Sequence, residues 1–149
     1  MNELVVDACS FILWSKVSFL EIIIERKLFT IVLTEDVLNE LEDEVSRFYV
    51  ERGKERGVIK IVKVKEEEKN KIKVKYKLGK GEVAAIAFCM KEGKIFITDD
   101  KKAEKKAEKE KVKVFTTPQV IKEFVKDDAL LSIIKEKIRK LYPNRFPEL

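Results

Sequence analysis

Three aspartates directly follow short apolar segments that the sequence predicts to be buried strands. Asp7 follows Glu3–Val6, and Asp99 and Asp100 follow Lys94–Thr98. An aspartate in such a place has two common roles: it caps the helix that follows, or it binds a hard divalent cation such as Mg²⁺ or Mn²⁺. A cation held by carboxylates can activate water for hydrolysis of a phosphodiester. The pattern leaves both interpretations open.

The absence of histidine narrows the chemistry. None of the 149 residues is a histidine, which excludes Ser-His-Asp and Cys-His nucleophilic catalysis and zinc sites of the HExxH type. The two cysteines, Cys9 and Cys89, lie in apolar segments and form no CxxC pair, so we expect reduced thiols and no structural zinc site. The remaining chemistry must use carboxylates, lysines, hydroxyls or a metal bound by oxygen.

Short buried strands alternate with amphipathic helices along the chain. Such alternation predicts a parallel sheet with helices on both faces, and no linker or repeat divides the sequence. We therefore expect one three-layer α/β/α domain over residues 1–149. The strands are expected at Glu3–Val6, Phe29–Leu33, Lys94–Thr98 and Val112–Phe115.

Two long helices are expected besides those that join the strands. Residues 34–57 form the first, and residues about 129–141 form an amphipathic helix near the C-terminus. The C-terminal helix is expected to pack on the domain, with a dimer or partner surface as the alternative. The apolar stripe of the first helix consists of Val37, Leu38, Leu41, Val45, Phe48 and Tyr49.

Two glutamates join the aspartates if the sheet is parallel. Ligands of an open parallel sheet bind at the carboxyl ends of its strands. Glu40 lies early in the helix after the second strand, and Glu82 lies in the first turn of a central apolar helix. Like charges that converge on this edge repel one another unless a cation neutralises them. Pattern alone does not separate Glu40 from Asp36, Glu42, Asp43 and Glu44, but Glu40 is one turn closer to the sheet than Glu44.

A lysine-rich insertion covers residues about 58–77. Lysines alternate with Val, Ile and Tyr on both sides of a charged turn, which predicts a β-hairpin with one basic face. The alternation slips at Val62, so a β-bulge or a helical alternative stays open. The lysines either form an RNA-binding arm or protect an edge strand from pairing, and the second role is slightly favoured.

The charge and the hydropathy of the sequence indicate a protein whose surface faces water. The net charge of +5 and the isoelectric point near 9.1 are compatible with an anionic partner such as nucleic acid. Interleaved Lys and Glu indicate solvated helix faces and are typical of proteins from hot environments. No apolar run is long enough for a membrane span, and the N-terminus lacks the basic region of a signal peptide, so we expect a cytoplasmic protein.

Four motifs in order give the chain a family resemblance. The segments "VVDACSFI", "VLNELE", "GEVAAIAF" and "FITDDKKA" resemble those of PIN-domain nucleases, in particular VapC-like toxins of toxin–antitoxin pairs. The resemblance implies a Rossmann-like α/β/α fold with one or two Mg²⁺ or Mn²⁺ ions in a carboxylate pocket. It also implies an endoribonuclease that cuts RNA phosphodiester bonds, a homodimer, and an antitoxin protein as partner.

The resemblance also assigns site residues. Asp7, Glu40 and Glu82 match the acids of the first three motifs, and either Asp99 or Asp100 matches the last, with Asp100 fitting the spacing better. The family often has Ser, Thr or Asn at the position of Cys9, and Ser10 follows it here. The alternative function is a PIN fold that binds RNA or a protein without cleaving.

Overall fold

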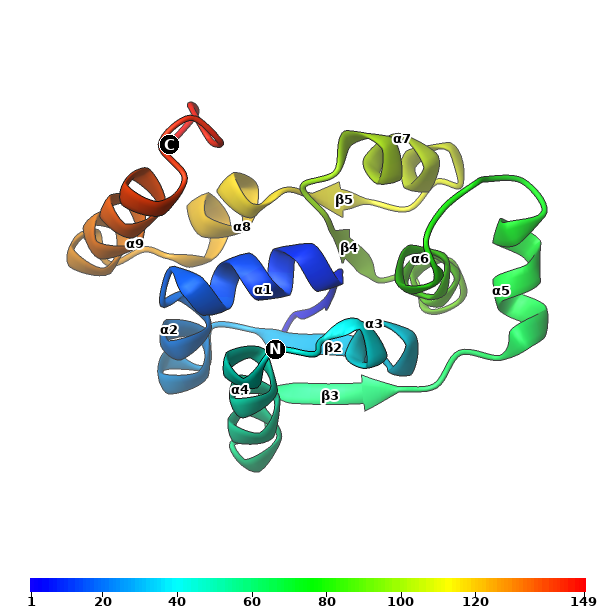
Figure 1. The fold of residues 1–149 in the computed structure, drawn as a ribbon, viewed down its shortest axis with the longest axis horizontal. Coiled ribbons are helices and arrows are strands. Elements are labelled where there is room, and N and C mark those ends of the chain that lie inside the picture. Colours follow the sequence, from blue (N-terminus) through cyan, green and yellow to red (C-terminus); the bar gives the residue numbers. More distant parts are fainter.

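The computed structural model describes residues 1–149 as five strands and nine helices (Figure 1). The strands are β1 (Glu3–Val6), β2 (Thr30–Thr34), β3 (Ile59–Val62), β4 (Ile95–Ile97) and β5 (Val114–Phe115). The helices are α1 (Ala8–Lys16), α2 (Phe19–Arg26), α3 (Glu35–Glu40), α4 (Glu44–Glu55), α5 (Glu66–Lys73), α6 (Lys80–Glu92), α7 (Lys101–Lys109), α8 (Thr117–Phe124) and α9 (Asp128–Leu141). None of these helices has the length and apolar character needed to cross a membrane.

The five strands form one parallel sheet in the order β3-β2-β1-β4-β5. The predicted central parallel sheet is therefore confirmed. The chain passes from β1 to β2 on one side and later crosses to β4 on the other side of β1, so the strand order reverses between β1 and β4. Open α/β sheets bind ligands at this point, beyond the carboxyl ends of the strands. Asp7 and Thr98 follow these two strands.

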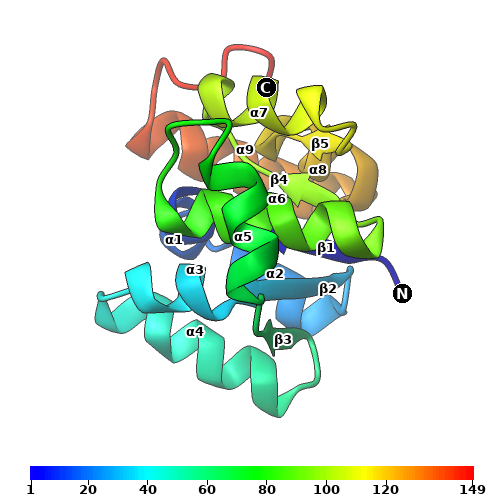
Figure 2. The ribbon, with the colours of Figure 1, turned by 90° about the vertical axis from the view of Figure 1, so that its right-hand side faces the viewer.

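Helices cover both faces of the sheet, which confirms the three layers (Figure 2). Alternate residues of β1 point to opposite faces: Leu4 and Val6 belong to a core of 25 buried residues, and Val5 belongs to a core of 15. The first core contains apolar residues of α1, α2, α8 and α9, and the second contains those of α5, α6 and α7. Small alanines on α6 and α7 allow close packing on the second face.

The single long helix predicted over residues 34–57 is wrong. The segment forms α3 and α4, with a break after Glu40. Asp43 caps α4, and Arg47 donates hydrogen bonds to the carbonyl oxygens of Leu38 and Leu41, which the break leaves without helical partners. Part of the predicted stripe faces solvent as a result, since Phe48 is 57% exposed. Glu40 becomes the last residue of α3.

The predicted lysine-rich hairpin over residues 58–77 is also wrong. Its first part is β3, which pairs in parallel with β2 at the edge of the sheet, and its second part is α5. Three glutamates open α5 and two lysines lie in its last turn, an order that complements the helix dipole. Ile72 anchors the helix in the second core. The helical alternative for this part of the chain is therefore correct.

The C-terminal helix appears as α9, close to the predicted bounds. Ile134 and Ile138 are buried in the first core, which confirms that this helix packs on the domain. Its other apolar side chains include Ile133 and Leu141, which are about half exposed.

Candidate active site

Asp7 lies at the switch point between β1 and β4 and is buried. Its backbone is extended and follows β1. Asp7 caps α1, because its Oδ1 accepts a hydrogen bond of 2.8 Å from the backbone N–H of Ser10. The hydroxyl of Thr98 donates to Oδ2 at 2.5 Å. Burial raises the pKa of Asp7 from 3.8 to about 6, and the two hydrogen bonds oppose this shift. The predicted capping role and a place at the sheet edge therefore coexist in one residue.

Asp99 is held between α1 and the start of α8. Its Oδ1 accepts from the backbone N–H of Thr117 at 2.7 Å, and its Oδ2 accepts from the hydroxyl of Thr117 at 2.5 Å. The hydroxyl of Ser10 donates to Oδ2 at 3.1 Å. Thr117 is itself fixed, because the indole N–H of Trp14 donates to its Oγ1 at 2.9 Å from inside the core. Both oxygens of Asp99 are thus oriented by buried groups.

Asp100 has a different setting. It is exposed and caps α7, with Oδ1 accepting from the backbone N–H groups of Lys102 at 2.8 Å and Ala103 at 3.2 Å. Thr98 Oγ1 in turn accepts from the backbone N–H of Asp100 at 3.2 Å. The two neighbouring aspartates therefore take different hydrogen-bond partners: the carboxylate of Asp99 binds Ser10, which also binds Asp7, whereas the carboxylate of Asp100 binds only the start of α7.

Glu40 and Glu82 approach the same edge from α3 and α6. A Cβ atom on Gly81 would clash with Oε1 of Glu40. Glycine at this position therefore allows the carboxylate to lie against the first turn of α6. Oε1 of Glu82 accepts from the backbone N–H of Gly79 at 3.1 Å. Burial raises the pKa of both glutamates, and neighbouring acids raise it further. Glu40 accepts a hydrogen bond from the backbone N–H of Gly81, so the start of α6 orients both carboxylates.

The five acids form one electrostatic group. The charge of Asp99 raises the pKa of Asp7, that of Asp7 raises the pKa of Glu40, and those of Glu40 and Asp100 raise the pKa of Glu82. None of the five carboxylates forms an ion pair with a lysine or arginine. The structure thus places the acids predicted from the sequence near one another without an ion pair, and the charge of Lys102 acts on Glu82 alone among those with a shifted pKa.

The carboxylate oxygens of the five acids are the type of ligand that a hard divalent cation prefers. Mg²⁺ prefers oxygen ligands and usually takes one or two carboxylates, completing its shell with water and substrate oxygens. The acids are spread along the edge, and no three of them close around a single point. The edge therefore has the oxygen chemistry that a cation needs but no closed cage of carboxylates.

Three hydroxyl residues complete the edge. Ser10, Thr98 and Thr117 orient Asp7 and Asp99, and the sequence analysis assigned them no role beyond the position of Ser10 beside Cys9. Thr117 is the second residue after β5 and Thr116 is the first, so the strand-end rule applied to hydroxyls points to this pair of threonines. Cys9 lies beside the acids, with part of the residue exposed. The pKa of its thiol is raised, first by the partial burial of the sulfur and then by the charges of Asp7, Glu82 and Glu40.

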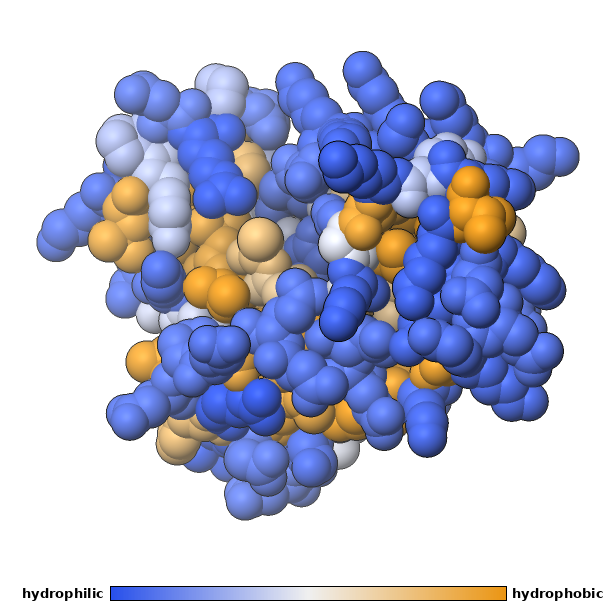
Figure 3. All heavy atoms as spheres, turned by 45° about the vertical axis from the view of Figure 1, so that its right-hand side comes forward, coloured by the Kyte–Doolittle hydropathy of each residue, from blue (hydrophilic) through white to orange (hydrophobic).

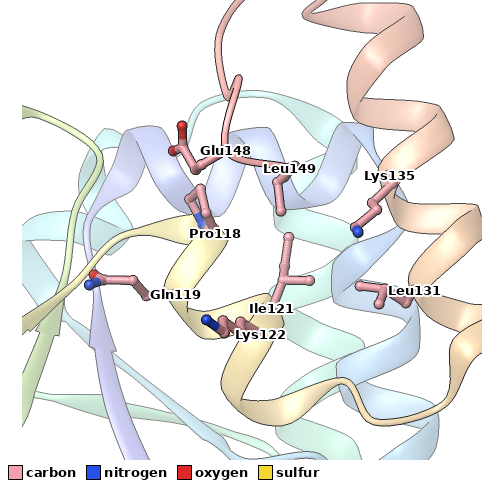
Figure 4. Close-up of a pocket in the computed structure, with 8 residues that line it drawn as sticks. All are labelled: Pro118, Gln119, Ile121, Lys122, Leu131, Lys135, Glu148 and Leu149. Carbon is pink, nitrogen blue, oxygen red and sulfur yellow. The ribbon is translucent and has the colours of Figure 1, made fainter.

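A separate hollow lies between α8, α9 and the C-terminal tail (Figure 4). Its volume is about 450 Å³, and apolar side chains of Pro118, Ile121, Leu131 and Leu149 line much of it. None of the five acids lines this hollow. The acidic edge, formed by strand ends and helix starts, is therefore separate from this hollow.

A parallel sheet with acids and hydroxyls at its carboxyl edge places the protein in the class of α/β proteins with a polar site at the switch point. The family model described as a PIN domain matches residues 3–146. The chain belongs to the PIN-domain family, as its four motifs indicated. PIN domains are generally nucleases, and they generally use divalent metal ions.

A solved structure shares this fold. A chain of the crystal structure of VapBC2 from Rickettsia felis bound to a DNA fragment from their promoter superposes with a TM-score of 0.54 at 10% sequence identity. The match covers 76% of this chain and 98% of that chain. At this identity the likeness bears on the fold. A comparison with curated protein sequences found no match.

Proposed function

We propose that the protein is a metal-dependent endoribonuclease whose site is the acidic edge. The observation that carries this proposal is that five carboxylates share one edge in a chain with 32 lysines and arginines, yet none of them has a basic partner. Such an arrangement is costly for the folded protein without a cation. Membership of the PIN-domain family supports the nuclease reaction.

The residues of the edge have separate roles in this proposal. Asp7 and Asp99 hold Mg²⁺ or Mn²⁺, since buried hydroxyls and N–H groups fix both side chains. Glu40, Glu82 and Asp100 add oxygen donors on the α3, α6 and α7 side of the edge. When bound, the metal supplies an activated water and charge stabilisation for phosphodiester hydrolysis.

The pKa of Asp7 sets the pH range of this site. Its value of about 6 means that the carboxylate form dominates above that pH, where it can bind a cation. We expect cleavage to fall as the pH drops below 6, because protons then compete with the metal for Asp7.

The experiment is cleavage of an end-labelled single-stranded RNA by the wild type, Asp7→Asn and Asp99→Asn, with Mn²⁺, with Mg²⁺ and with EDTA. A single-stranded DNA of the same sequence tests the choice of RNA. We expect metal-dependent cutting of RNA that both substitutions abolish. A folded wild type that binds RNA but cuts neither polymer would support the alternative, a PIN fold that binds without cleaving.

The toxin interpretation adds partners to the proposal. The fold shared with a chain of a VapBC2 complex supports an antitoxin protein as partner, and the family resemblance implies a homodimer as the assembly. Light scattering on the purified chain measures the assembly directly. A mass of about 35 kDa, twice the 17.4 kDa of one chain, is expected, and a mass of one chain contradicts the dimer.

A further inference from the structure

The lysines of residues 66–80 fall into two groups that differ in their ion pairs. Lys69, Lys71, Lys73 and Lys75 each have Nζ within 3.0–3.4 Å of a carboxylate oxygen. Lys77 and Lys80, closer to α6, have no such partner. The first group is neutralised within the fold, and the second leaves two exposed positive charges for an external anion.

These two lysines line a shallow hollow of about 520 Å³, which we call the lysine hollow. Lys73 and Lys75 also line it, and its remaining wall consists of Val74, Tyr76, Leu78 and Val83. The side chain of Val74 is unusually bare for an apolar residue, at 81% exposed. The hollow therefore combines unpaired cations with an open apolar surface.

The wall of the lysine hollow is anchored to α7. The hydroxyl of Tyr76 donates to Oε2 of Glu110 at 2.5 Å, and Lys75 pairs with the same carboxylate at 3.1 Å. The Nζ of Lys106 lies 5.3 Å from the centre of the Tyr76 ring, a cation–π contact. These contacts hold the segment between α5 and α6 in place beside α7, although no sheet pairs with it.

The lysine hollow lies at the start of α6, the same end of the helix that carries Glu82. Lys80 begins α6 two residues before Glu82, and Val83 of the hollow follows Glu82 directly. Lys102, at the start of α7, is close enough to Glu82 to lower its pKa. In Figures 1 and 2, α5, α6 and α7 lie together on one side of the molecule, and Figure 3 shows hydrophilic side chains over most of that side with apolar atoms between them.

We propose that the lysine hollow binds one nucleotide of a single-stranded nucleic acid next to the bond to be cut, an inference that rests on the proposed function. Lys77 and Lys80 contact phosphates, and the apolar side chains of Val74 and Leu78 take the face of the base. Only an unpaired strand can present a base to such a wall, since the bases of a duplex are stacked inside it. The paired lysines of α5 stabilise the fold and bind no substrate.

The test measures binding in EDTA, where a metal-dependent nuclease does not cut. A fluorescent single-stranded RNA is titrated with wild type and with the double variant Lys77→Gln/Lys80→Gln over a series of salt concentrations. Each phosphate contact to a single strand contributes about 0.7 to the slope of log K against log salt, so the variant should lower the slope by about 1.4. An unchanged slope would overturn the proposal.

A matched control has the same loss of net charge. Lys63 and Lys91 are exposed, have no ion pair and line a smaller hollow near the opposite end of α6. The variant Lys63→Gln/Lys91→Gln should keep the wild-type slope. An equal drop in both double variants would show that net charge, rather than the lysine hollow, sets the binding.

The base contact is tested separately. Val74→Asn changes an exposed side chain, so little effect on stability is expected, and it should weaken binding of the single strand without changing the salt slope. A blunt duplex of the same sequence should bind more weakly than the single strand. Equal binding of Val74→Asn and wild type, or of duplex and single strand, would contradict the assigned base contact.

The outcomes separate this inference from the proposed function. If RNA binding depends on Lys77 and Lys80 but no metal supports cutting, the nuclease proposal fails and the lysine hollow stands. If metal-dependent cutting occurs and the salt slope is unaffected, the nuclease proposal stands and the lysine hollow is wrong.

Discussion

Two regions of this protein concentrate charge and treat it in opposite ways. On α5 and just after it, four lysines pair with carboxylates of α3, α5 and residue 110. At the carboxyl edge of the sheet, five acids accept hydrogen bonds only from neutral donors, namely backbone N–H groups and the hydroxyls of serine and threonine. The first region is neutralised by the fold, and the second is not.

The comparison separates the paired lysines, whose charges stabilise the fold, from the unpaired acids, whose charges are available to a ligand. Exposed Lys–Glu pairs on α5 each contribute a few tenths of a kcal/mol. Unpaired carboxylates at the edge repel one another, and three of them have raised pKa values as a result of burial and of this repulsion. A divalent cation that binds only the folded state would stabilise it.

The largest expected effect distinguishes Asp99 from Asp100. Asp99→Asn weakens a carboxylate that is held by three donors beside Asp7, so we expect kcat/KM for RNA to fall by more than about 100-fold, beyond the range seen for groups that only orient a ligand. Asp100→Asn keeps a side chain suited to the N-cap of α7 and should have the smaller effect on activity. A larger loss in Asp100→Asn would reverse the assignment.

The second effect concerns stability and pH in EDTA. The pKa of Asp7 is higher in the folded protein, about 6, than the ordinary value of 3.8. The folded state thus binds the proton more tightly, and the contribution of Asp7 to the free energy of unfolding increases as the pH falls from 6 to 4. The full change is about 3 kcal/mol. Urea unfolding of wild type and Asp7→Asn at each pH isolates this group, and parallel curves would contradict it.

The sequence predicted much of this edge because one rule of parallel sheets applies to it. Asp7, Asp99 and Asp100 are visible at strand ends, and the strand pattern then places Glu40 and Glu82 beside them. The rule did not separate Asp99 from Asp100, because the difference lies in Thr117 and Ser10, which are 18 and 89 residues from Asp99 in sequence.

Local patterns failed where tertiary contacts or helix charges decided the structure. The break between α3 and α4 contains no glycine or proline, and Arg47 satisfies the carbonyl oxygens that the break exposes. The alternation of lysines over residues 58–77 resembled a hairpin, but glutamates at the start and lysines at the end of α5 favour a helix. The lysine hollow could not be predicted, because it depends on which lysines find partners.

The third effect tests the hydroxyls that the sequence left unassigned. Thr117→Val removes a donor to Asp99 and the acceptor for Trp14, and the loss of such an orienting group typically costs about 10- to 100-fold in metal affinity or activity. Thr117→Ser keeps the hydroxyl and should restore most of the activity. Equal activity of the Val and Ser variants would mean that the hydroxyl does not orient Asp99.

The smallest effect is expected on α5. Lys71→Gln removes an exposed pair with Glu68, so the free energy of unfolding should fall by less than about 0.5 kcal/mol. RNA affinity in EDTA should stay at the wild-type value. A clear loss of affinity would erase the distinction between the paired lysines of α5 and the unpaired lysines of the hollow.

The central claim is that the unpaired acids bind a divalent cation. Its most direct test is the melting temperature of wild type and Asp7→Asn as Mn²⁺ is added to metal-free protein. We predict that the melting temperature of the wild type rises with Mn²⁺ while that of Asp7→Asn stays nearly constant. No rise in the wild type, or an equal rise in both proteins, would contradict a cation site at the carboxyl edge of the sheet.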